Sequence, residues 1–341
     1  MKLNLDDIAR FAGVSRTTVS RVINDHPDVS ASTRQKVWKV IEEHHFQPNL
    51  VARMLARQRT QILGIVIRNP IGAFRSYYTS ILFQGINDIT NEHDYATLMW
   101  WESQRREETD RFSQRILQQN RLVDGILIAT AEMDALLIDH MVEMRIPFVM
   151  MAKPIRHADR ISYVTIDNVQ AAQTAVEHLI RQGRRRIGHI TGALTDIDGQ
   201  DRLTGYRTTL EQHGIPFDPR LVAEGAFTRE SGYSAMRELL AREVAIDAVF
   251  AGNDNTAEGA LVALHQAGVR IPDDIALVGF DDLPIAQDLN PPLTTIRQPI
   301  YERGARATAL LLDIIEGGVK EPQQIILPTQ LVVRQSCGAP V

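Results

Sequence analysis

The 341-residue sequence has only one cysteine, Cys337, and no hydrophobic run long enough to cross a membrane. A single cysteine cannot build an intrachain disulfide framework, so we expect a reducing, cytoplasmic setting. The N-terminal stretch MKLNLDDIAR contains no apolar signal core, which argues against secretion. The sequence therefore predicts a cytoplasmic protein without a membrane partner.

Sequence motifs that are typical of enzymes are missing as well. We find no P-loop lysine motif, no GxGxxG after a strand, no GxSxG nucleophile elbow and no histidines or cysteines at metal-ligand spacing. The segment GNDNTAEG, residues 252–259, has two glycines but lacks the lysine of a phosphate-binding loop. We therefore expect no catalytic residue, no metal site and no cofactor.

Positive charge is scarce overall but concentrated near the N-terminus. The formal net charge is −5. Residues 1–60 contain ten Lys or Arg and six Asp or Glu, whereas residues 61–341 contain 27 and 36. A basic N-terminal segment joined to an acidic body indicates one module that binds a polyanion and another that binds something else. The length is sufficient for two or three domains.

Three short helices are predicted within residues 1–47. Gly13 supplies a tight turn that requires a positive φ, and Ser15 can cap the helix that follows. The spacing of Ala9 and Gly13, with apolar residues on both sides, lets two helices cross closely. This arrangement is typical of a helix-turn-helix, whose second helix projects outward.

The second of these helices has a polar face that contains no carboxylate. On a helical projection, its apolar arc contains Val19, Val22 and Ile23. The other arc contains Arg16, Thr17, Ser20, Arg21 and Asn24. Arginine can bind guanine through two hydrogen bonds, and hydroxyl and amide groups suit phosphate oxygens. A merely solvated face usually mixes both signs of charge, so this pattern favours a DNA-binding helix.

Two stretches, LDDIARFAGVSRTTVSRVIND and VSASTRQKVWKVIEEHHFQPNLVARMLA, resemble the DNA-binding headpiece of the lactose-repressor (LacI/GalR) family. The resemblance extends over essentially the whole chain. It implies a transcriptional regulator, usually a repressor, that binds a near-palindromic operator. Arg16, Thr17 and Arg21 would then read base edges in the major groove. The implied phosphate contacts are Ser15, Thr18, Ser20 and Asn24.

The segment QPNLVARMLARQRT, residues 47–60, is more apolar than a linker requires. An amphipathic connector that packs on its own domain is one interpretation. The family resemblance implies instead a hinge helix that folds when two subunits bind DNA together, with Leu55 inserted into the minor groove. Asn49 and Ala52 are further expected DNA contacts in this segment.

From Gln61 onward, short apolar runs alternate with helical stretches, which is typical of doubly wound α/β lobes with parallel sheets. One series comprises ILGIVI, ATLMWW, DGILIA and PFVMM, and a second comprises ISYVTI, RIGHI, LVAEG, DAVFAG and IALVGFDD. A helix over about 300–316 and two strands are expected to follow. The resemblance implies a periplasmic-binding-protein-like body in which these last segments cross back between the lobes.

Polar and aromatic residues follow many of these apolar runs. Ligands of open α/β sheets bind beyond the carboxyl ends of the strands, so we expect these side chains to line one crevice. Aromatic rings would cover the C–H faces of a polyhydroxylated effector, while Asp, Asn and Arg would satisfy its hydroxyl groups. The candidate residues are Arg68, Trp101, Lys153, Arg202, Phe227, Asn253, Asp254 and Asp281.

Four of these candidates match effector-contact positions of the resembled family, namely Arg202, Phe227, Asn253 and Asp281. The simplest alternative for Arg202 and Asp281 is an inter-strand salt bridge. For Arg68, Trp101, Lys153 and Asp254 it is a solvated loop position. Lys153 stands where sugar-responsive members often carry arginine. This additional basic group keeps phosphorylated or acidic sugars among the candidate effectors.

These patterns predict an all-α headpiece followed by an α/β body of two doubly wound parallel-sheet lobes. The expected domains are a helix-turn-helix domain (1–47), a hinge helix and linker (48–60) and an effector-binding domain (61–341). The expected lobes are an N-lobe of about 61–160 and 295–325, and a C-lobe of about 161–294 and 326–341.

The predicted function is that of a bacterial, nucleoid-associated regulator whose affinity for operator DNA depends on a carbohydrate effector. The C-terminal SCGAPV lacks the heptad helix of tetrameric relatives, which favours a homodimer. A periplasmic-type solute-binding protein shares the two-lobed body, but it would need a signal peptide and no helix-turn-helix. Measurable turnover of a ligand bound in the cleft would instead favour an enzyme.

Overall fold

The computed structural model describes residues 3–24, 26–46, 59–68, 76–102, 109–129, 135–242, 244–319 and 321–339. These residues form two compact units. One unit contains residues 1–62 with 122–124, and the other contains the remainder of the chain. We describe each unit separately.

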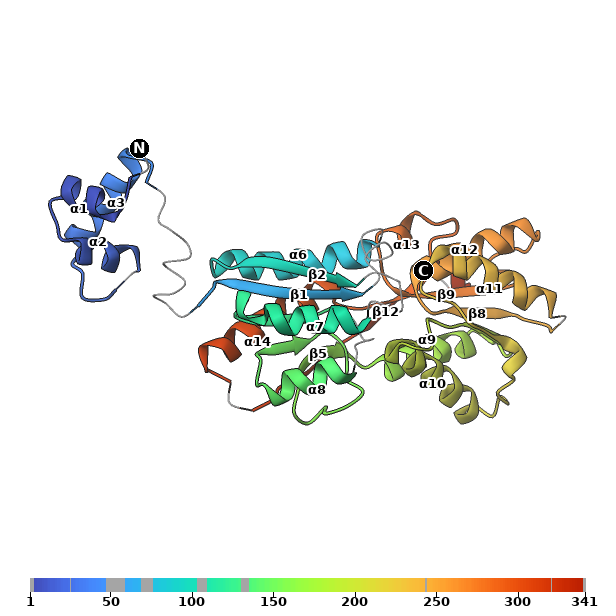
Figure 1. Cartoon of the computed structure of the whole chain (residues 1–341). Coiled ribbons are helices and arrows are strands. Elements are labelled where there is room, and N and C mark those ends of the chain that lie inside the picture. The colour runs from blue at the N-terminus through green and yellow to red at the C-terminus, as the bar shows by residue number, and fades with distance from the viewer. Residues whose placement is uncertain are drawn as a thin grey trace. The chain divides into compact units, whose positions relative to one another are not determined.

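The N-terminal unit contains three helices, α1 (Leu5–Ala12), α2 (Arg16–Ile23) and α3 (Ala31–Glu43) (Figure 1). Ser15 and Ser30 cap α2 and α3, because their side chains accept hydrogen bonds from backbone N–H groups of the first turn. The turn between α1 and α2 passes through Gly13, whose φ of 60° lies in the left-handed region. The predicted turn glycine is therefore confirmed.

Apolar residues from all three helices form the core of this unit. Ile8, Val19 and Val37 are fully buried and belong to one cluster. Burial of one side of α2 leaves its opposite side available to a partner. The helix-turn-helix fold predicted from the apolar spacing is confirmed.

The first lobe of the body contains a six-stranded sheet in the order β11-β5-β4-β3-β1-β2. The strands are β1 (Ile62–Arg68), β2 (Ala96–Glu102), β3 (Gly125–Ile128), β4 (Phe148–Met150), β5 (Ser162–Ile166) and β11 (Gln324–Leu327). The associated helices are α6 (Tyr77–Glu92), α7 (Thr109–Gln119), α8 (Ala135–Glu143) and α14 (Ile300–Glu316), with a short 3-10 helix at Asn120–Leu122. Helices α6 and α14 pack together against one face of this sheet.

The second lobe contains another six-stranded sheet, in the order β12-β10-β9-β8-β6-β7. The strands are β6 (Ile187–Ile190), β7 (Val222–Ala223), β8 (Ala248–Ala251), β9 (Ala276–Asp281), β10 (Thr294–Arg297) and β12 (Gln330–Val332). The helices are α9 (Asn168–Arg181), α10 (Ile197–Gln212), α11 (Arg229–Ala241), α12 (Asp254–Gln266) and α13 (Ile285–Asp288), and two 3-10 helices cover Pro219–Leu221 and Gln335–Cys337.

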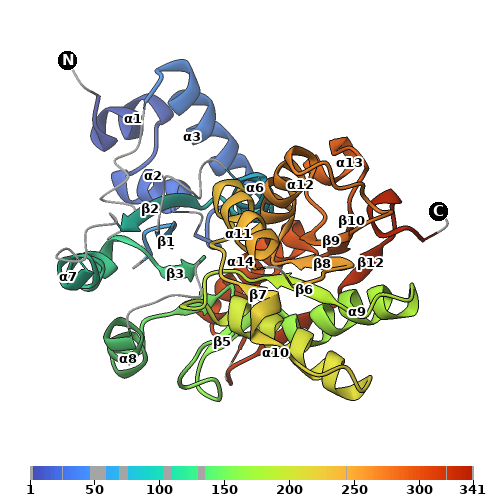
Figure 2. The same ribbon diagram turned by 90° about the vertical axis from the view of Figure 1, so that its right-hand side faces the viewer.

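Helices cover both faces of the second sheet (Figure 2). Phe250 packs with α9 and α10 on one face, whereas its neighbour Val249 packs with α11 and α12 on the other. Successive strand residues point to opposite faces, so a strand covered on both sides must be apolar throughout. This explains the continuous apolar run of β8, and the predicted doubly wound fold is confirmed.

The lobe bounds expected from the sequence need correction at two strands. Residues 162–166 were expected in the C-lobe, but β5 pairs in parallel with β4 and β11 in the first sheet. Residues 294–297 fall in the expected N-lobe range almost entirely, but β10 pairs with β9 and β12 in the second sheet. Strand pairing joins segments distant in sequence, so apolar runs alone do not show which sheet a strand joins.

Three connections therefore pass between the lobes, after β5, after β10 and after β11. Helix α14 lies between β10 of the second sheet and β11 of the first, and its predicted span of 300–316 is confirmed. None of the helices in the described ranges is both long and apolar enough to span a bilayer.

Candidate functional site

The outward face of α2 carries the predicted DNA-contacting side chains. Arg16, Thr17 and Arg21 are exposed, while Val19 and Val22 of the same helix are buried. The Arg16 guanidinium lies 3.8 Å from the Asp6 carboxylate, a distance typical of a loose, solvent-exposed ion pair. This face therefore presents cationic and hydroxyl groups without a carboxylate of its own helix.

The flanking polar residues of α2 are held in place by local hydrogen bonds. The Ser15 hydroxyl accepts from the Thr18 backbone N–H at 3.0 Å and lies 2.8 Å from the Thr18 hydroxyl. The Asn24 amide donates to the Ser20 hydroxyl at 3.4 Å. The predicted hinge contacts Asn49, Ala52 and Leu55 lie outside the described residues.

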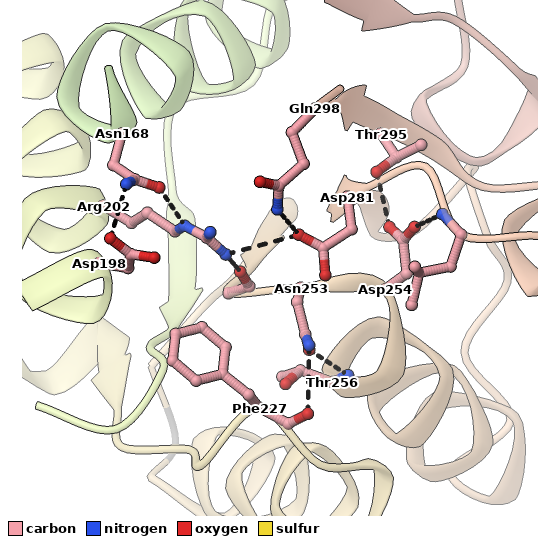
Figure 3. Close-up of polar contacts among 12 residues, drawn as sticks. Asn168, Asp198, Arg202, Phe227, Asn253, Asp254, Thr256, Asp281, Thr295 and Gln298 are labelled. Carbon is pink, nitrogen blue, oxygen red and sulfur yellow. Dashed lines mark hydrogen bonds and ion pairs between the residues drawn. The ribbon is translucent and has the colours of Figure 1, made fainter. Parts of the chain in front are cut away.

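A second group of polar side chains gathers at the carboxyl edge of the second sheet, where its parallel strands end (Figure 3). Asp281 is the last residue of β9, and Asn253 follows β8 and caps α12. Phe227 follows β7, and Arg202 lies on α10, which follows β6. The four residues that match the resembled family's effector contacts are thus brought together, as the strand order predicts.

Arg202 is the centre of this group, although only 4% of its surface is exposed. Its Nε donates to the Asn168 side chain at 3.0 Å, and its Nη1 donates to the Gly252 carbonyl at 2.5 Å. The guanidinium stacks 3.7 Å from the ring centre of Phe280 and 5.3 Å from that of Phe227. A guanidinium fixed by so many neighbours is preorganised, so it can orient a ligand without further ordering.

Asp281 is buried in an unusual backbone conformation. Its φ is 114° and that of Asp282 is 58°, both in the region that favours glycine. Burial raises the pKa of the Asp281 carboxyl to about 6, while the nearby Arg202 guanidinium and hydrogen bonds from Gln298 and Asn253 oppose this rise. Backbone strain combined with a buried acceptor is a frequent feature of ligand sites.

Phe227 is held over the backbone of the adjacent strand end. A side chain at Gly192 would overlap the Phe227 ring, so this close approach requires glycine. The Asn253 amide donates to the Phe227 carbonyl at 3.1 Å, and its oxygen accepts from the Thr256 N–H at 2.9 Å. Ring and amide are therefore positioned as one unit.

Asp254 is another predicted effector contact, and its carboxylate is bound by donors of the protein itself. It is fully buried, and its two oxygens accept from the Leu283 N–H at 2.7 Å and the Thr295 hydroxyl at 2.6 Å. Burial, together with the nearby Asp281 carboxyl, raises the pKa of Asp254 well above its usual range. Asp254 thus links the 281–283 loop to β10, and its contact with the effector stays a prediction.

For the predicted effector contacts of the first lobe, the structure gives fewer contacts than for those of the second lobe. Lys153 is exposed and faces α10: burial raises the pKa of Asp201 there, and the Lys153 ammonium opposes that rise. Trp101 is about half exposed, with 51% of its surface accessible, and its backbone oxygen accepts from Arg115 at 3.3 Å. Arg68 ends β1. These three remain predictions.

Three members of the polar group were missed by the sequence analysis. Asn168 accepts from Arg202 and donates to Asp198 at 2.9 Å, and Gln298 donates to Asp281 at 2.5 Å. Burial raises the pKa of Asp198 to about 7, with Asp196 adding to the rise. Asn168 and Gln298 closely follow β5 and β10, so the same position after a strand could have identified them.

The group as a whole is suited to binding, not to holding a metal. Among the described residues, no set of three His, Cys, Asp or Glu side chains is arranged around a common metal position. Amide, carboxylate and guanidinium groups beside the Phe227 ring provide donors, acceptors and an apolar surface in one place. Such a combination fits a hydroxylated organic molecule.

Comparison with known proteins places both units in one family. Residues 4–49 match the bacterial regulatory proteins of the lacI family, and residues 176–337 match a periplasmic binding protein-like domain. The HTH-type transcriptional regulator CelR of Thermobifida fusca is 36% identical over 334 residues, which are 97% of each chain.

Solved structures agree over nearly the full length. The transcriptional regulator CelR–cellobiose complex has a TM-score of 0.77 and 35% identity, covering 98% of this chain and 99% of that chain. The lac repressor dimer bound to operator and the anti-inducer ONPF has a TM-score of 0.85 and 26% identity, covering 99% and 100%.

These full-length relatives are transcriptional regulators, which sets aside the enzyme considered from the sequence. The match over residues 4–49 likewise sets aside a simple solute-binding protein. The three-helix unit, the two doubly wound lobes and the similarity over 97% of the chain lead to one conclusion. This protein belongs to the lacI family of bacterial regulatory proteins.

Proposed function

We propose that this protein is a cytoplasmic, DNA-binding transcriptional repressor whose operator affinity is controlled by a sugar or sugar derivative. The observation that carries the proposal is the outward face of α2, where exposed Arg16, Thr17 and Arg21 lie opposite a fully apolar buried stripe. Exposed arginine and threonine on the second helix of a helix-turn-helix are suited to reading base edges.

On the DNA side, Arg16, Thr17 and Arg21 contact base edges in this proposal. The residues assigned to phosphates are Ser15, Thr18, Ser20 and Asn24. Residues 1–47 form the DNA-binding domain, and residues 48–60, with Asn49, Ala52 and Leu55, form a hinge that contacts the minor groove. The chain acts as a homodimer, so that two such faces meet the half-sites of a near-palindrome.

On the effector side, residues 61–341 bind the ligand between the two lobes. Arg202, Asn253, Asp281 and Phe227 bind from the second lobe, and Lys153, Trp101 and Arg68 approach from the first. A relative whose structure contains cellobiose supports a carbohydrate of this general class. The Phe227 ring would cover one face of the sugar, while the buried polar groups bind its hydroxyls.

The loop after Asp281 offers a physical link between the ligand and the arrangement of the lobes. Asp254 accepts from the Leu283 N–H, and the fully buried Leu283 belongs to the apolar cluster of the first lobe. A ligand that changes the position of Asp281 therefore also acts on a contact between the lobes. An effector controls DNA binding only through its different affinities for the two arrangements.

The test combines operator selection with effector titration. The full-length protein is first used to select DNA from a random-sequence pool, and the selected site is measured by fluorescence anisotropy. Sugars, sugar phosphates and nucleosides are then added one at a time. We expect enrichment of a near-palindromic site and a change in its affinity of tenfold or more, about 1.4 kcal/mol, with at least one sugar. Failure to enrich any sequence would contradict the proposal.

A further inference from the structure

Arg303 is a buried cation near the start of α14. Only 4% of its surface is exposed, the same fraction as for Arg202. Yet among the described residues, neither its Nε nor its Nη1 has a hydrogen-bond acceptor, and no carboxylate forms an ion pair with it. The centre of the Tyr78 ring lies 5.3 Å from its guanidinium carbon. Buried charges are costly unless paired, so this arrangement needs an explanation.

The position of Arg303 places it at the carboxyl edge of the first sheet. Helix α14 precedes β11, which runs parallel to β5, so α14 begins at the edge where the strands end. Arg303 lies in the first turn of α14, and helical side chains tilt toward the helix N-terminus. Tyr78 lies in the first turn of α6, which follows β1 and begins at the same edge.

Two further features of this helix end are its missing side-chain cap and the buried amide of Gln298. The N-cap residue of α14 is Pro299, and no side chain caps the helix. Gln298, the residue before it, is buried, and its Oε1 has no hydrogen-bond partner among the described residues, although its Nε2 donates to Asp281. An uncapped helix N-terminus together with an unpaired arginine provides strong attraction for an anion.

Comparison with Arg202 indicates which of the two buried arginines can bind an anion. The Arg202 guanidinium donates to Asn168 and to the Gly252 carbonyl, and the Asp281 carboxylate lies 3.9 Å away, so Arg202 has acceptors and a counter-charge within the fold. The Nε and Nη1 atoms of Arg303 have no such acceptor in the part of the chain that the structure describes. Burial lowers the pKa of Arg303 to about 10, so it remains charged at neutral pH. An anionic group of a ligand would therefore provide the hydrogen-bond acceptors and the negative charge that the Nε and Nη1 atoms of Arg303 lack among the described residues.

We infer that the effector carries an anionic group, a carboxylate or a phosphate, that binds Arg303 in the first lobe while its hydroxyl groups bind the Asp281 group in the second. This inference rests on the proposed function, since it assigns a chemical class to the same ligand. Gln298 joins the two halves, because it contacts Asp281 and directly precedes Pro299, the N-cap of the helix that carries Arg303. The anion thus distinguishes the effector from a neutral sugar.

The test compares neutral and acidic members of one sugar series. Glucose, glucuronate and glucose 6-phosphate, with the three galactose equivalents, are titrated into the full-length protein by calorimetry. We expect one acidic member to bind at least tenfold more tightly than its neutral parent, since a charge-assisted hydrogen bond exceeds a neutral one. Preference for the uronate identifies a carboxylate, and preference for the ester identifies a phosphate.

Variants of α14 decide whether Arg303 is responsible. Arg303→Met should abolish the acidic preference, whereas Arg306→Met, which removes an exposed arginine from the same helix, should preserve it. If Arg303→Met does not fold, Arg303→Gln removes the charge with less change in polarity and should give the same loss. An acidic preference that survives loss of the Arg303 charge, or the absence of any acidic preference, overturns the inference.

A further variant separates this inference from the proposed function. Asp281→Asn should weaken the binding of neutral and acidic sugars alike, because it alters the second-lobe half of the site. If Asp281→Asn weakens both while Arg303→Met leaves the preference for acidic sugars unchanged, only the inference of an anionic effector is wrong. If Asp281→Asn has no effect on any ligand that binds, the proposed effector site itself is wrong.

Discussion

The Arg202 guanidinium and the Asp281 carboxylate lie 3.9 Å apart, both almost completely buried, without forming a direct hydrogen bond. Both groups form hydrogen bonds with other residues. Arg202 donates to Asn168 and Gly252, and Asp281 accepts from Gln298. A salt bridge formed only for stability would be expected to close to hydrogen-bonding distance. The separation instead leaves two opposite charges fixed beside each other, where a hydroxyl group can bind both.

Asp281→Asn should abolish or strongly weaken the effector response while operator binding remains. The amide keeps the shape of the side chain but removes the charged acceptor, so effector affinity should fall by about tenfold or more. Fluorescence anisotropy with operator DNA, with and without effector, measures both properties. Asp288→Asn, an exposed carboxylate on α13, is the control and should behave as the wild type.

Arg21→Ala should weaken specific DNA binding by about 1–3 kcal/mol and non-specific binding less. Arg21 is exposed on α2, on the face assigned to base edges. Affinities for the selected operator and for random DNA at one salt concentration provide the comparison. Lys39→Ala removes the same charge from α3, where Lys39 is 75% exposed, and should affect both DNAs little. Equal losses on both DNAs for Arg21→Ala would rule out base reading by this residue.

The body should lose stability through Asp198 as the pH rises. Burial and Asp196 raise the pKa of Asp198 to about 7 in the folded state, above the ordinary value of 3.8 for an aspartate. The folded protein therefore binds more protons than the unfolded one between these values, and the contribution of Asp198 to stability falls as pH rises through this window.

Thermal melting of Asp198→Asn beside the wild type tests this contribution. The melting temperature of the variant should increase relative to that of the wild type between pH 5 and pH 8. Asp288→Asn should show no such trend. A constant difference between Asp198→Asn and the wild type across this range would mean that Asp198 keeps an ordinary pKa in the folded protein.

Asp254→Ala should lower the free energy of unfolding by roughly 2–4 kcal/mol, because it leaves two buried donors without an acceptor. These donors are the Leu283 N–H and the Thr295 hydroxyl. Chemical denaturation measures the change, and Asp313→Ala, an exposed carboxylate on α14, should cost little. A loss as small as that of Asp313→Ala would show that Asp254 does not support the 281–283 loop.

Local sequence patterns were sufficient to predict the helices and strands and many of the candidate site residues. Gly13 and Ser15 mark the boundaries of α2, and alternating apolar and polar positions identify its exposed face. Positions after strands located Arg202, Asn253 and Asp281 at one edge, because parallel strands end on the same side of a sheet. Such features depend on neighbours within a few residues, which is why they can be read from the chain.

The sequence by itself thus determined the helix-turn-helix, the alternating strands and helices, and the family. Only the tertiary structure decided that β5 joins the first sheet and β10 the second, and that Asp254 is fully buried. It also decided that the Nε and Nη1 atoms of the buried Arg303 have no acceptor among the described residues. Strand order, burial and pairing depend on segments far apart in the chain. A residue's own sequence neighbours do not specify them.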